Sequence, residues 1–385
     1  MSSPDTTCDR CLEWAAERNY AGYDPYDGLN SPFIDSIATN WLTRLVGMHT
    51  VNKAPINLRP LLGVPAERNP KGIALFAMTY LNRYRDTGRS ADKEQAEKLL
   101  RWLDTNQSEA YDQAAWGYNF DWQNARKFYL PAYHPSIVVT VFGGRAFLEY
   151  YETTGEQWAL ETAQSAASFI QDHINREMVN GFDVFTYTPH DSFVLINTNA
   201  LAAGFFYQLS AHTDSSELLD RASHLFEFVV DAQVDSGGWY YAMPADESYL
   251  SHDNFHTGFV LESLHGYAMA QSSDHPAREA YEKGLRFYRD NLFDANGAPR
   301  FEADKRYPYD AHAAAQAILT FAQRDTDVDR EMAHAVYEWS IANLLDDNGY
   351  FYRRIGRVLT DKTPYMRWSQ AWLCRALSNL QLKTG

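Results

Sequence analysis

The sequence of 385 residues predicts an all-α protein built from six helical hairpins that close into a ring. Six apolar helical segments rich in Ala, Leu and Gly recur at intervals between 56 residues (Asn197 to Asp253) and 66 residues (Asn69 to Pro135). The segments begin near Asn69, Pro135, Asn197, Asp253, Asp310 and Trp368. Each of them follows a long loop dense in Gly, Trp, Tyr and Phe, so the chain repeats one structural unit.

A more amphipathic helix accompanies each apolar segment. Charged residues recur at helical spacing in these helices, which we place at 32–47, 91–106, 156–173, 216–233, 277–291 and 329–344. The apolar segments are nearly free of charge, and closure into a double ring buries them on all sides. An open superhelix, the alternative, would need polar caps at its ends. We therefore predict a single (α/α)6 toroid over residues 20–385, with residues 1–19 as an N-terminal appendage.

The composition narrows the class of protein. Apolar residues make up 45% of the chain and aromatic residues 15%, which is enough for a large core. No run of 18 apolar residues occurs, so we expect no transmembrane helix. The net charge of −16 argues against a nucleic-acid partner, because phosphate contacts need a basic surface. The polar N-terminus lacks a hydrophobic signal core and favours the cytoplasm. The oligomeric state stays open.

Metal and cofactor signatures are weak in this sequence. Cys8 and Cys11 form a C-x-x-C, but Cys374 is distant and a structural zinc site normally needs four ligands. We interpret the pair as reduced thiols one turn apart on a short helix. The chain contains no H-E-x-x-H, no G-x-S-x-G, no phosphate loop and no dinucleotide fingerprint. We therefore expect neither a metal nor a cofactor.

The long loops and the first turns of the apolar helices must surround one funnel, which is where a site belongs. Capping needs one polar residue at each helix start. These entrances offer two or three, and the surplus indicates function: Arg68 and Asn69; His134 and Ser136; Asn197, Thr198 and Asn199; Asp253, Asn254 and His256; Asp310 and His312; Arg367, Trp368 and Ser369.

The stretch Asp253-Asn254-Phe255-His256-Thr257 is the strongest of these entrances. Asp253 is a good N-cap, and Asp253, His256 and Thr257 share one face of the first turn because they lie three and four residues apart. Taken alone, the stretch is a capped helix with a hydrogen-bonded histidine. As the fourth of six matching entrances, it becomes the best candidate for the reactive wall of the funnel.

Aromatic and charged residues of the loops suggest what the funnel binds. Aromatic rings such as Trp122 and Trp239 beside carboxylates and amides suit sugar rings, although some of them must hold the loops down. The first, fifth and sixth long loops are net positive and would be neighbours in a closed ring, whereas the third and fourth are net negative. We expect a polarised funnel that holds an anionic group against its basic wall.

Three functions fit these residues. The first is proton abstraction next to the carboxylate of a uronic acid, giving epimerisation or elimination, with His256 or a tyrosine as base and arginine or amide donors on the carboxylate. The second is glycoside hydrolysis by paired carboxylates such as Asp253 and Asp310. The third is glycan binding without catalysis. We expect catalysis from His256, Asp253, Asp310 and Tyr240, and substrate binding from Asn254, Asn197, Asn199, His312, Trp239, Trp122, Asp121, Arg68, Arg306, Arg353, Arg367 and Trp368.

The chain resembles a known superfamily in this pattern. Aromatic loops that enter the inner helices of a toroid, from about Tyr20 to Gly385, resemble the (α/α)6 carbohydrate-active superfamily. More narrowly, Ser192-Phe193-Val194-Leu195, Gly238-Trp239-Tyr240-Tyr241-Ala242-Met243 and Asp253-Asn254-Phe255-His256-Thr257 are similar to stretches of the helical domain of glucuronyl C5-epimerases. Their order along the chain differs, and that family's separate β-domains have no counterpart here. The resemblance implies a role in polysaccharide synthesis or modification.

Overall fold

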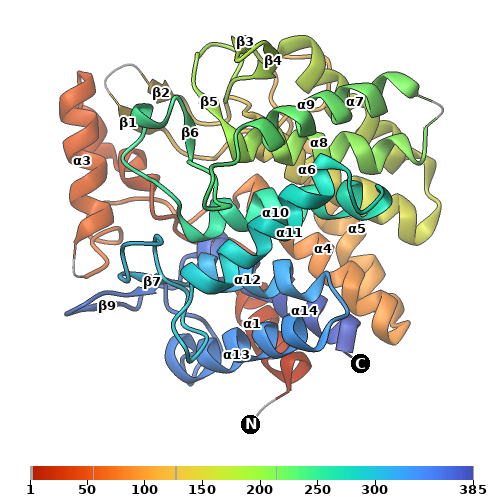
Figure 1. The fold of residues 1–385 in the computed structure, drawn as a ribbon. Coiled ribbons are helices and arrows are strands. Elements are labelled where there is room, and N and C mark those ends of the chain that lie inside the picture. The colour runs from red at the N-terminus through yellow and green to blue at the C-terminus, as the bar shows by residue number, and fades with distance from the viewer. Residues whose placement is uncertain (1–2, 55, 126–127, 214, 385) are drawn as a thin grey trace.

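The fold is a double ring of helices, as the sequence predicts (Figure 1). The computed structural model describes residues 3–54, 56–125, 128–213 and 215–384. The inner helices are α4 (Pro70–Thr87), α6 (Ile137–Thr154), α8 (Ile196–Ser210), α10 (Asn254–Ala270), α12 (Ala311–Ala322) and α14 (Trp372–Thr384). Their outer partners are α5 (Ser90–Thr105), α7 (Gln157–His173), α9 (Ser216–Asp231), α11 (Pro276–Asn291), α13 (Asp327–Leu344) and α1 (Pro4–Glu17).

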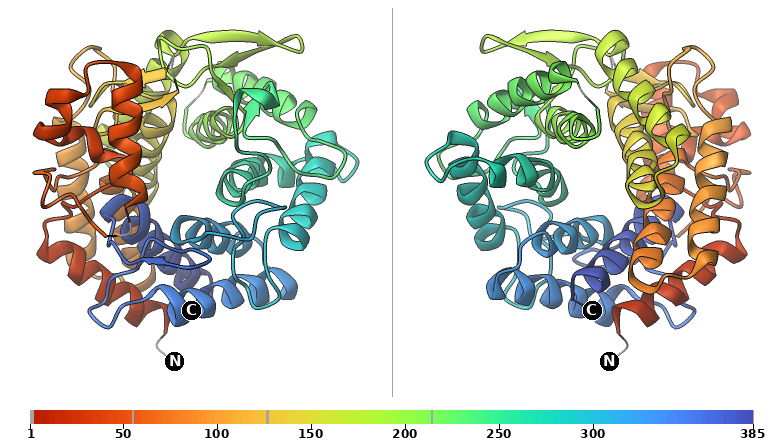
Figure 2. Two further views of the ribbon diagram at one scale, coloured as in Figure 1. Left: turned by 90° about the vertical axis from the view of Figure 1, so that its left-hand side faces the viewer. Right: turned by 90° about the vertical axis from the view of Figure 1, so that its right-hand side faces the viewer.

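The inner ring is closed. Each inner helix packs against the next one, and α14 at the end of the chain packs against α4 at its start. Both views of Figure 2 show the helices arranged around a common axis. Closure buries the inner helices on all sides, so that α12 is buried from Ala311 to Ala322. This explains why its sequence AHAAAQAILTFA contains no Asp, Glu, Lys or Arg.

Local sequence signals set the ends of the hairpins. Asn69, Ser136 and Asp253 cap α4, α6 and α10 by accepting a hydrogen bond from a first-turn amide. At the opposite end, Gly88 and Gly155 adopt left-handed φ angles of 71° and 75°, which end α4 and α6 and begin the short turns to the outer helices. The long loops therefore gather at the N-terminal end of the inner helices.

Helix α1 lies within the segment 1–19 that the sequence sets apart from the toroid. It packs against α14, in the position of an outer helix for the sixth hairpin. Its buried side chains Cys8, Cys11, Leu12 and Ala15 are spaced i, i+3, i+4 and i+7 and belong to the main hydrophobic core. The stripe is inconspicuous in the sequence because it contains two cysteines, one alanine and a single leucine. Cys8 and Cys11 are buried free thiols.

The outer helix expected at 32–47 is instead a pair of helices at the mouth of the ring. α2 (Pro32–Ile37) ends before Asn40, whose side chain begins α3 (Trp41–Lys53) with a capping box. The pair packs on the 3-10 turn η1 (Asp27–Asn30) around a small core of its own, formed by Leu29, Ile34, Ala38, Met48 and Val51. Figure 1 shows α3 standing apart from the hairpins, beside β1.

Short strands lie in the long loops. Antiparallel pairs form between β1 (Trp122–Ala125) and β2 (Phe128–Leu130), between β3 (Arg176–Val179) and β4 (Phe182–Phe185), and between β5 (Val194–Leu195) and β6 (Ala242–Met243). A three-stranded sheet contains β7 (Tyr309–Asp310), β8 (Arg354–Ile355) and β9 (Thr360–Asp361), with Asp310 opposite Arg354. The other short helices are η2 (Ala245–Glu247) and the π-helix η3 (Met366–Ala371). Among the described residues, no helix is long and apolar enough to cross a membrane.

Replacing Leu12 with Ala tests whether α1 belongs to the ring. Leu12 is 4% exposed in the main core, so the cavity left by the truncation should lower the free energy of unfolding by about 2–4 kcal/mol. Leu42 on α3 is 51% exposed, and Leu42→Ala should change it by less than about 0.5 kcal/mol. Urea unfolding measures both. Equal, small effects for the two variants would mean that α1 contributes little to the core.

Candidate functional site

A cavity of about 610 Å³ opens at the end of the ring where the long loops gather. Its walls come from the starts of the inner helices, from the loops that lead into them, and from α3. Eight of the residues expected at the site line it: His256, Asp310, Asn197, His312, Trp122, Arg353, Arg367 and Trp368. The structure therefore joins residues that are up to 246 positions apart in sequence, Trp122 and Trp368.

His256 lines the cavity and is held from behind by Asp253. Its Nδ1 lies 2.8 Å from Asp253 Oδ2, and the other carboxylate oxygen accepts from the His256 backbone amide at 3.1 Å. Because a carboxylate only accepts, the contact favours the neutral tautomer that carries its proton on Nδ1 and its lone pair on Nε2. Asp253 is itself 2% exposed and does not line the cavity. It orients the histidine rather than meeting a ligand.

His312 is a second histidine in the cavity wall, and it is 2% exposed. Its ring packs between Phe255 and Trp372, with centroid distances of 4.5 and 4.4 Å. Neither ring nitrogen has a hydrogen-bond partner among the described residues. Burial, followed by the positive charges of Lys71 and Arg367, holds the pKa of His312 well below its ordinary value. His312 is therefore a neutral imidazole with unused donor and acceptor capacity.

Asp310 contributes a carboxylate to the same wall. It caps α12, and its Oδ1 accepts hydrogen bonds from the His312 amide at 2.9 Å and from Trp368 Nε1 at 2.7 Å. Burial raises the pKa of Asp310, although the nearby guanidinium of Arg353 opposes the shift. Asp310 thus fixes the ring of Trp368 and the start of the helix that carries His312.

The three sequence stretches that resemble glucuronyl C5-epimerases meet in this cavity. Val194 pairs with Met243 and Leu195 with Ala242 in the β5–β6 ladder. The ladder places Tyr241 against His256, with ring centroids 4.3 Å apart. Tyr241 lines the cavity, whereas its neighbour Tyr240 does not and packs against His252, with ring centroids 4.4 Å apart.

Five basic and two acidic side chains line the cavity among the residues that the structure describes: Lys53, Lys71, Arg353, Arg354 and Arg367 against Glu247 and Asp310. Arg367 is neutralised by a bidentate ion pair with Asp24, at 2.6 and 2.8 Å. Arg353 pairs with Asp361 and donates to Asn52 of α3. These two arginines therefore line the cavity and also hold the surrounding loops in place.

No ion pair of Lys53, Lys71 or Arg354 is found within the described part of the chain. Lys53 is exposed to solvent, whereas Lys71 is buried and Arg354 is half-buried. Lys71 is 2% exposed, and its Nζ lies 4.2 Å from the ring centroid of Phe142, 5.1 Å from Trp372 and 5.3 Å from Phe259. Burial, reinforced by the charge of Arg367, lowers the pKa of Lys71 well below its ordinary value. An anionic group of a ligand would compensate the positive charges of Lys71 and Arg354.

The remaining predicted site residues lie outside the cavity lining. Asn254, Asn199 and Trp239 are buried and hold the scaffold: they donate to the carbonyl oxygens of Leu292, Phe185 and Val229. Asp121 binds the Tyr129 hydroxyl and the Ala132 amide, Arg68 binds Asn19, and Arg306 pairs with Asp294. These residues stabilise the helices and loops. Counting polar groups at the helix starts could not distinguish such structural residues from residues that line the cavity.

Sequence reasoning missed Lys71 and the wall formed by α3. Lys71 does carry a signal, because it is a charge in the first turn of an inner helix and the apolar run Gly72–Met78 follows it. His49 and Asn52 of α3 line the cavity, but their helix is not part of a hairpin and its position could not be inferred from the repeat. Among the described residues, no group of three or more His, Cys, Asp or Glu side chains is arranged to hold a metal ion.

Comparisons with known proteins identify structures of similar fold. No family model matches the sequence, and no curated protein matches it. The structure is similar to a sugar epimerase from a ruminal bacterium, with a TM-score of 0.65, 13% identity, and coverage of 84% of this chain and 90% of that chain. It is also similar to a family 76 α-mannanase from Bacteroides thetaiotaomicron, with a TM-score of 0.61, 15% identity, and coverage of 81% and 85%.

An unsaturated glucuronyl hydrolase specific for heparin is a further neighbour, with a TM-score of 0.58, 14% identity, and coverage of 80% of this chain and 85% of that chain. The three neighbours are carbohydrate-active enzymes with the (α/α)6 toroid, so the expected fold resemblance is confirmed. At such low identity the likeness defines the fold class alone.

Replacing His312 with Phe should make stability less dependent on pH in the acidic range. In the unfolded chain His312 takes up a proton as the pH falls through about 6.5, whereas the folded protein keeps it neutral to lower pH. Its contribution to stability is therefore complete above about pH 6.5 and is lost as the pH falls, by at most about 1.4 kcal/mol per pH unit.

Urea unfolding of the wild type and the His312→Phe variant at a series of pH values tests this sign. The difference in free energy of unfolding should shift in favour of the variant as the solution becomes more acidic. A difference that stays constant with pH would mean that His312 is protonated as readily in the folded protein as in the unfolded chain.

Proposed function

We propose that this protein is an enzyme that removes a proton from a carbon of an anionic sugar, next to a carboxylate or carbonyl group, and so catalyses epimerisation or elimination. The observation that carries the proposal is the pair formed by Asp253 and His256, with Nδ1 of the histidine bound to the carboxylate at 2.8 Å. The pair places a lone pair at Nε2 against an aromatic cavity.

A general base needs a free lone pair and a fixed orientation. Asp253 supplies the orientation twice, through the ring nitrogen and through the backbone amide of His256. Asp253 also stabilises the imidazolium that forms when Nε2 takes the proton of the sugar. The ring of Tyr241 packs on His256 and limits its rotation.

His312 has the properties of the partner group. Proton abstraction next to a carboxylate or carbonyl places negative charge on its oxygen, and a donor must stabilise that charge. A neutral imidazole can donate such a hydrogen bond without a compensating anion. The two unpartnered nitrogens of His312 support this role, as does the phenylalanine pair, Phe255 and Phe259, that packs on both histidines.

The cavity supports an anionic sugar as substrate. Trp122, Tyr241 and Trp368 offer aromatic faces to the apolar side of a sugar ring. Lys71 and Arg354 offer positive charge without a carboxylate partner among the described residues, which suits the carboxylate of a uronic acid. The names of the sugar epimerase and of the glucuronyl hydrolase among the structural neighbours agree with a sugar and with a uronic acid, respectively.

Glycoside hydrolysis is the second candidate, and one observation favours it. Asp310 lines the cavity and its pKa is raised by burial, which suits the acid of a carboxylate pair. Its expected partner Asp253 does not reach the cavity because it is engaged by His256, so the second carboxylate would have to be Glu247. The presence of an α-mannanase among the structural neighbours also supports this candidate.

Replacing His256 with Ala should lower kcat at least about 100-fold, because the general base is lost. Asp253→Asn should also lower kcat, because an amide no longer enforces the protonated Nδ1 tautomer. Tyr240→Phe is the matched control, since Tyr240 lies on His252 outside the cavity, and its kcat should stay within about threefold of the wild type. Steady-state kinetics on a uronic-acid substrate, with circular dichroism to verify folding, measures all three.

Two results would contradict the proton-transfer mechanism. One is full activity of a folded His256→Ala variant. The other is hydrolysis of a glycoside that Asp310→Asn abolishes and His256→Ala preserves, which would establish the second candidate. Saturable glycan binding without turnover of epimerase, lyase or hydrolase substrates would instead show a non-catalytic toroid.

Replacing Lys71 with Met should raise KM for a uronic-acid substrate by about tenfold or more, the effect of losing one charge-assisted hydrogen bond of about 1.5–3 kcal/mol. KM for the corresponding neutral sugar should change far less, because that sugar lacks the carboxylate. Arg306→Met is the control, since Arg306 pairs with Asp294 outside the cavity. Equal losses for charged and neutral sugars would show that Lys71 supports the wall and does not bind the carboxylate.

A further inference from the structure

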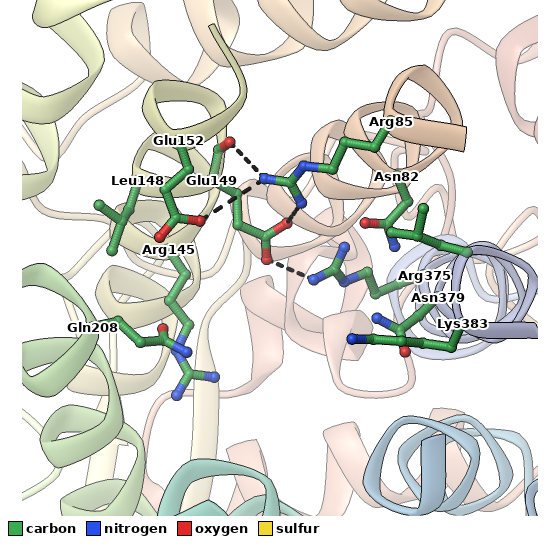
Figure 3. A pocket seen from close by; sticks show the side chains of 11 residues that line it. Asn82, Arg85, Arg145, Leu148, Glu149, Glu152, Gln208, Arg375, Asn379 and Lys383 are labelled. Carbon is green, nitrogen blue, oxygen red and sulfur yellow. Dashed lines mark hydrogen bonds and ion pairs between the residues drawn. The ribbon is translucent and has the colours of Figure 1, made fainter. Parts of the chain in front are cut away.

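We propose that a second cavity, at the end of the ring formed by the short turns, binds the phosphate or carboxylate group of a small molecule. The cavity has a volume of about 250 Å³ and lies between α4, α6, α8 and α14, at the end opposite the aromatic cavity. Figure 3 shows the side chains that line it. The proposal does not depend on the function proposed above, because no residue lines both cavities.

Arg145 is the central observation. It stands on the inner helix α6, lines the cavity and is 7% exposed. A guanidinium has five N–H donors, yet Arg145 makes one hydrogen bond to a side chain, from Nη2 to Ser263 Oγ at 3.3 Å. Its closest carboxylate oxygen is 3.8 Å away, on Glu262, and its Nε has no partner among the described residues. The protein therefore compensates the buried positive charge of Arg145 only weakly, and a bound anion would stabilise it.

The backbone around Arg145 makes room for its guanidinium. A Cβ atom built on Gly204 of α8 would lie 2.8 Å from Arg145 Nη2 and 3.1 Å from Ser263 Cβ. The glycine therefore allows α6, α8 and α10 to approach each other with the arginine between them. Burial lowers the pKa of Arg145, which agrees with a positive charge that its surroundings solvate poorly.

Two further arginines are held in place beside this cavity. Glu149 of α6 accepts from Arg375 of α14 at 2.5 Å and from Arg85 of α4 at 3.4 Å, so one carboxylate fixes both guanidinium groups (Figure 3). The backbone carbonyls of Met78 and Glu149 hold the same two arginines at 3.1 and 3.0 Å. Forks of this kind, fixed before a ligand arrives, match the geometry of phosphate and carboxylate oxygens.

The balance of charge favours an anion over a cation or a neutral ligand. Among the described residues, four basic side chains (Arg85, Arg145, Arg375 and Lys383) and two acidic ones (Glu149 and Glu152) line the cavity, an excess of two positive charges on a chain with a net charge of −16. Lys383 has no ion pair within the described residues. The amides of Asn82, Asn379 and Gln208 also line the cavity, together with Leu148 and Leu382. The amides offer hydrogen bonds. They suit the further oxygens of such a ligand.

The size of the cavity limits the ligand. A volume of about 250 Å³ holds on the order of eight water molecules at about 30 Å³ each. Inorganic phosphate, a phosphate ester of a few carbons or a short dicarboxylate fits this space, and a polysaccharide does not. The ligand would join α4, α6 and α14, and its binding would therefore stabilise the closed ring by mass action.

Titration with inorganic phosphate and with malonate, each at constant ionic strength set with sodium chloride, tests the proposal. Isothermal titration calorimetry gives Kd, and thermal unfolding gives the accompanying rise in Tm. Arg145→Met should weaken binding at least about tenfold, as expected for the loss of a charge-assisted hydrogen bond. Arg330→Met is the matched control: Arg330 is an arginine of α13 that pairs with Asp325 and Asp327 away from the cavity, and its Kd should remain within about twofold.

A response to phosphate alone identifies a phosphate ligand, and a response to malonate alone identifies a carboxylate ligand. If Arg145→Met fails to fold, Lys383→Met replaces it, because Lys383 is exposed and its loss should weaken binding without unfolding the protein. The proposal is overturned if neither anion binds saturably, or if the folded Arg145 or Lys383 variant binds as tightly as the Arg330 control. In that case the arginines form only an ion-pair network between helices.

Discussion

The packing of α14 against α4 is the contact on which both cavities depend, because it closes the inner ring. Closure directs the N-terminal ends of the inner helices to one side and their short turns to the other. It brings Lys71 at the start of α4 close to Trp372 at the start of α14, although about 300 residues separate them in the chain. It also places Arg85 of α4 beside Arg375 of α14, through the Glu149 carboxylate that they share.

Burial inside the closed ring sorts the charged side chains into two kinds. Arg367 and Arg353 meet carboxylates and keep their charge, so they act as braces between the loops, α3 and the ring. The charges of Lys71, His312 and Asp310 are not fully compensated by an ion pair. Burial therefore shifts the pKa of each group in the direction that favours its neutral form. Perturbed groups of this kind, gathered in one aromatic cavity, are typical of catalytic sites.

The sequence predicts the ring and its polar entrances because both follow from local patterns. Apolar periodicity, caps such as Asp253 and breakers such as Gly155 act within a few residues and can be read directly. The role of α1 could not be predicted in this way, because its buried stripe consists of Cys, Leu and Ala and its partner α14 is at the other end of the chain. Likewise, nothing local distinguishes Tyr241, which reaches the cavity, from Tyr240, which does not.

The proposed exchange of a proton between His256 and a carbon of a sugar can be measured by deuterium incorporation. Unlabelled uronic-acid saccharides would be incubated with the wild-type protein in heavy water and followed by NMR and mass spectrometry. We expect deuterium to enter the substrate or its epimer at the carbon next to the carboxylate, and we expect the His256→Ala variant to incorporate none. Turnover that leaves every carbon-bound proton in place, with solvent oxygen appearing at a released anomeric carbon, would contradict the proposed exchange and identify a hydrolase.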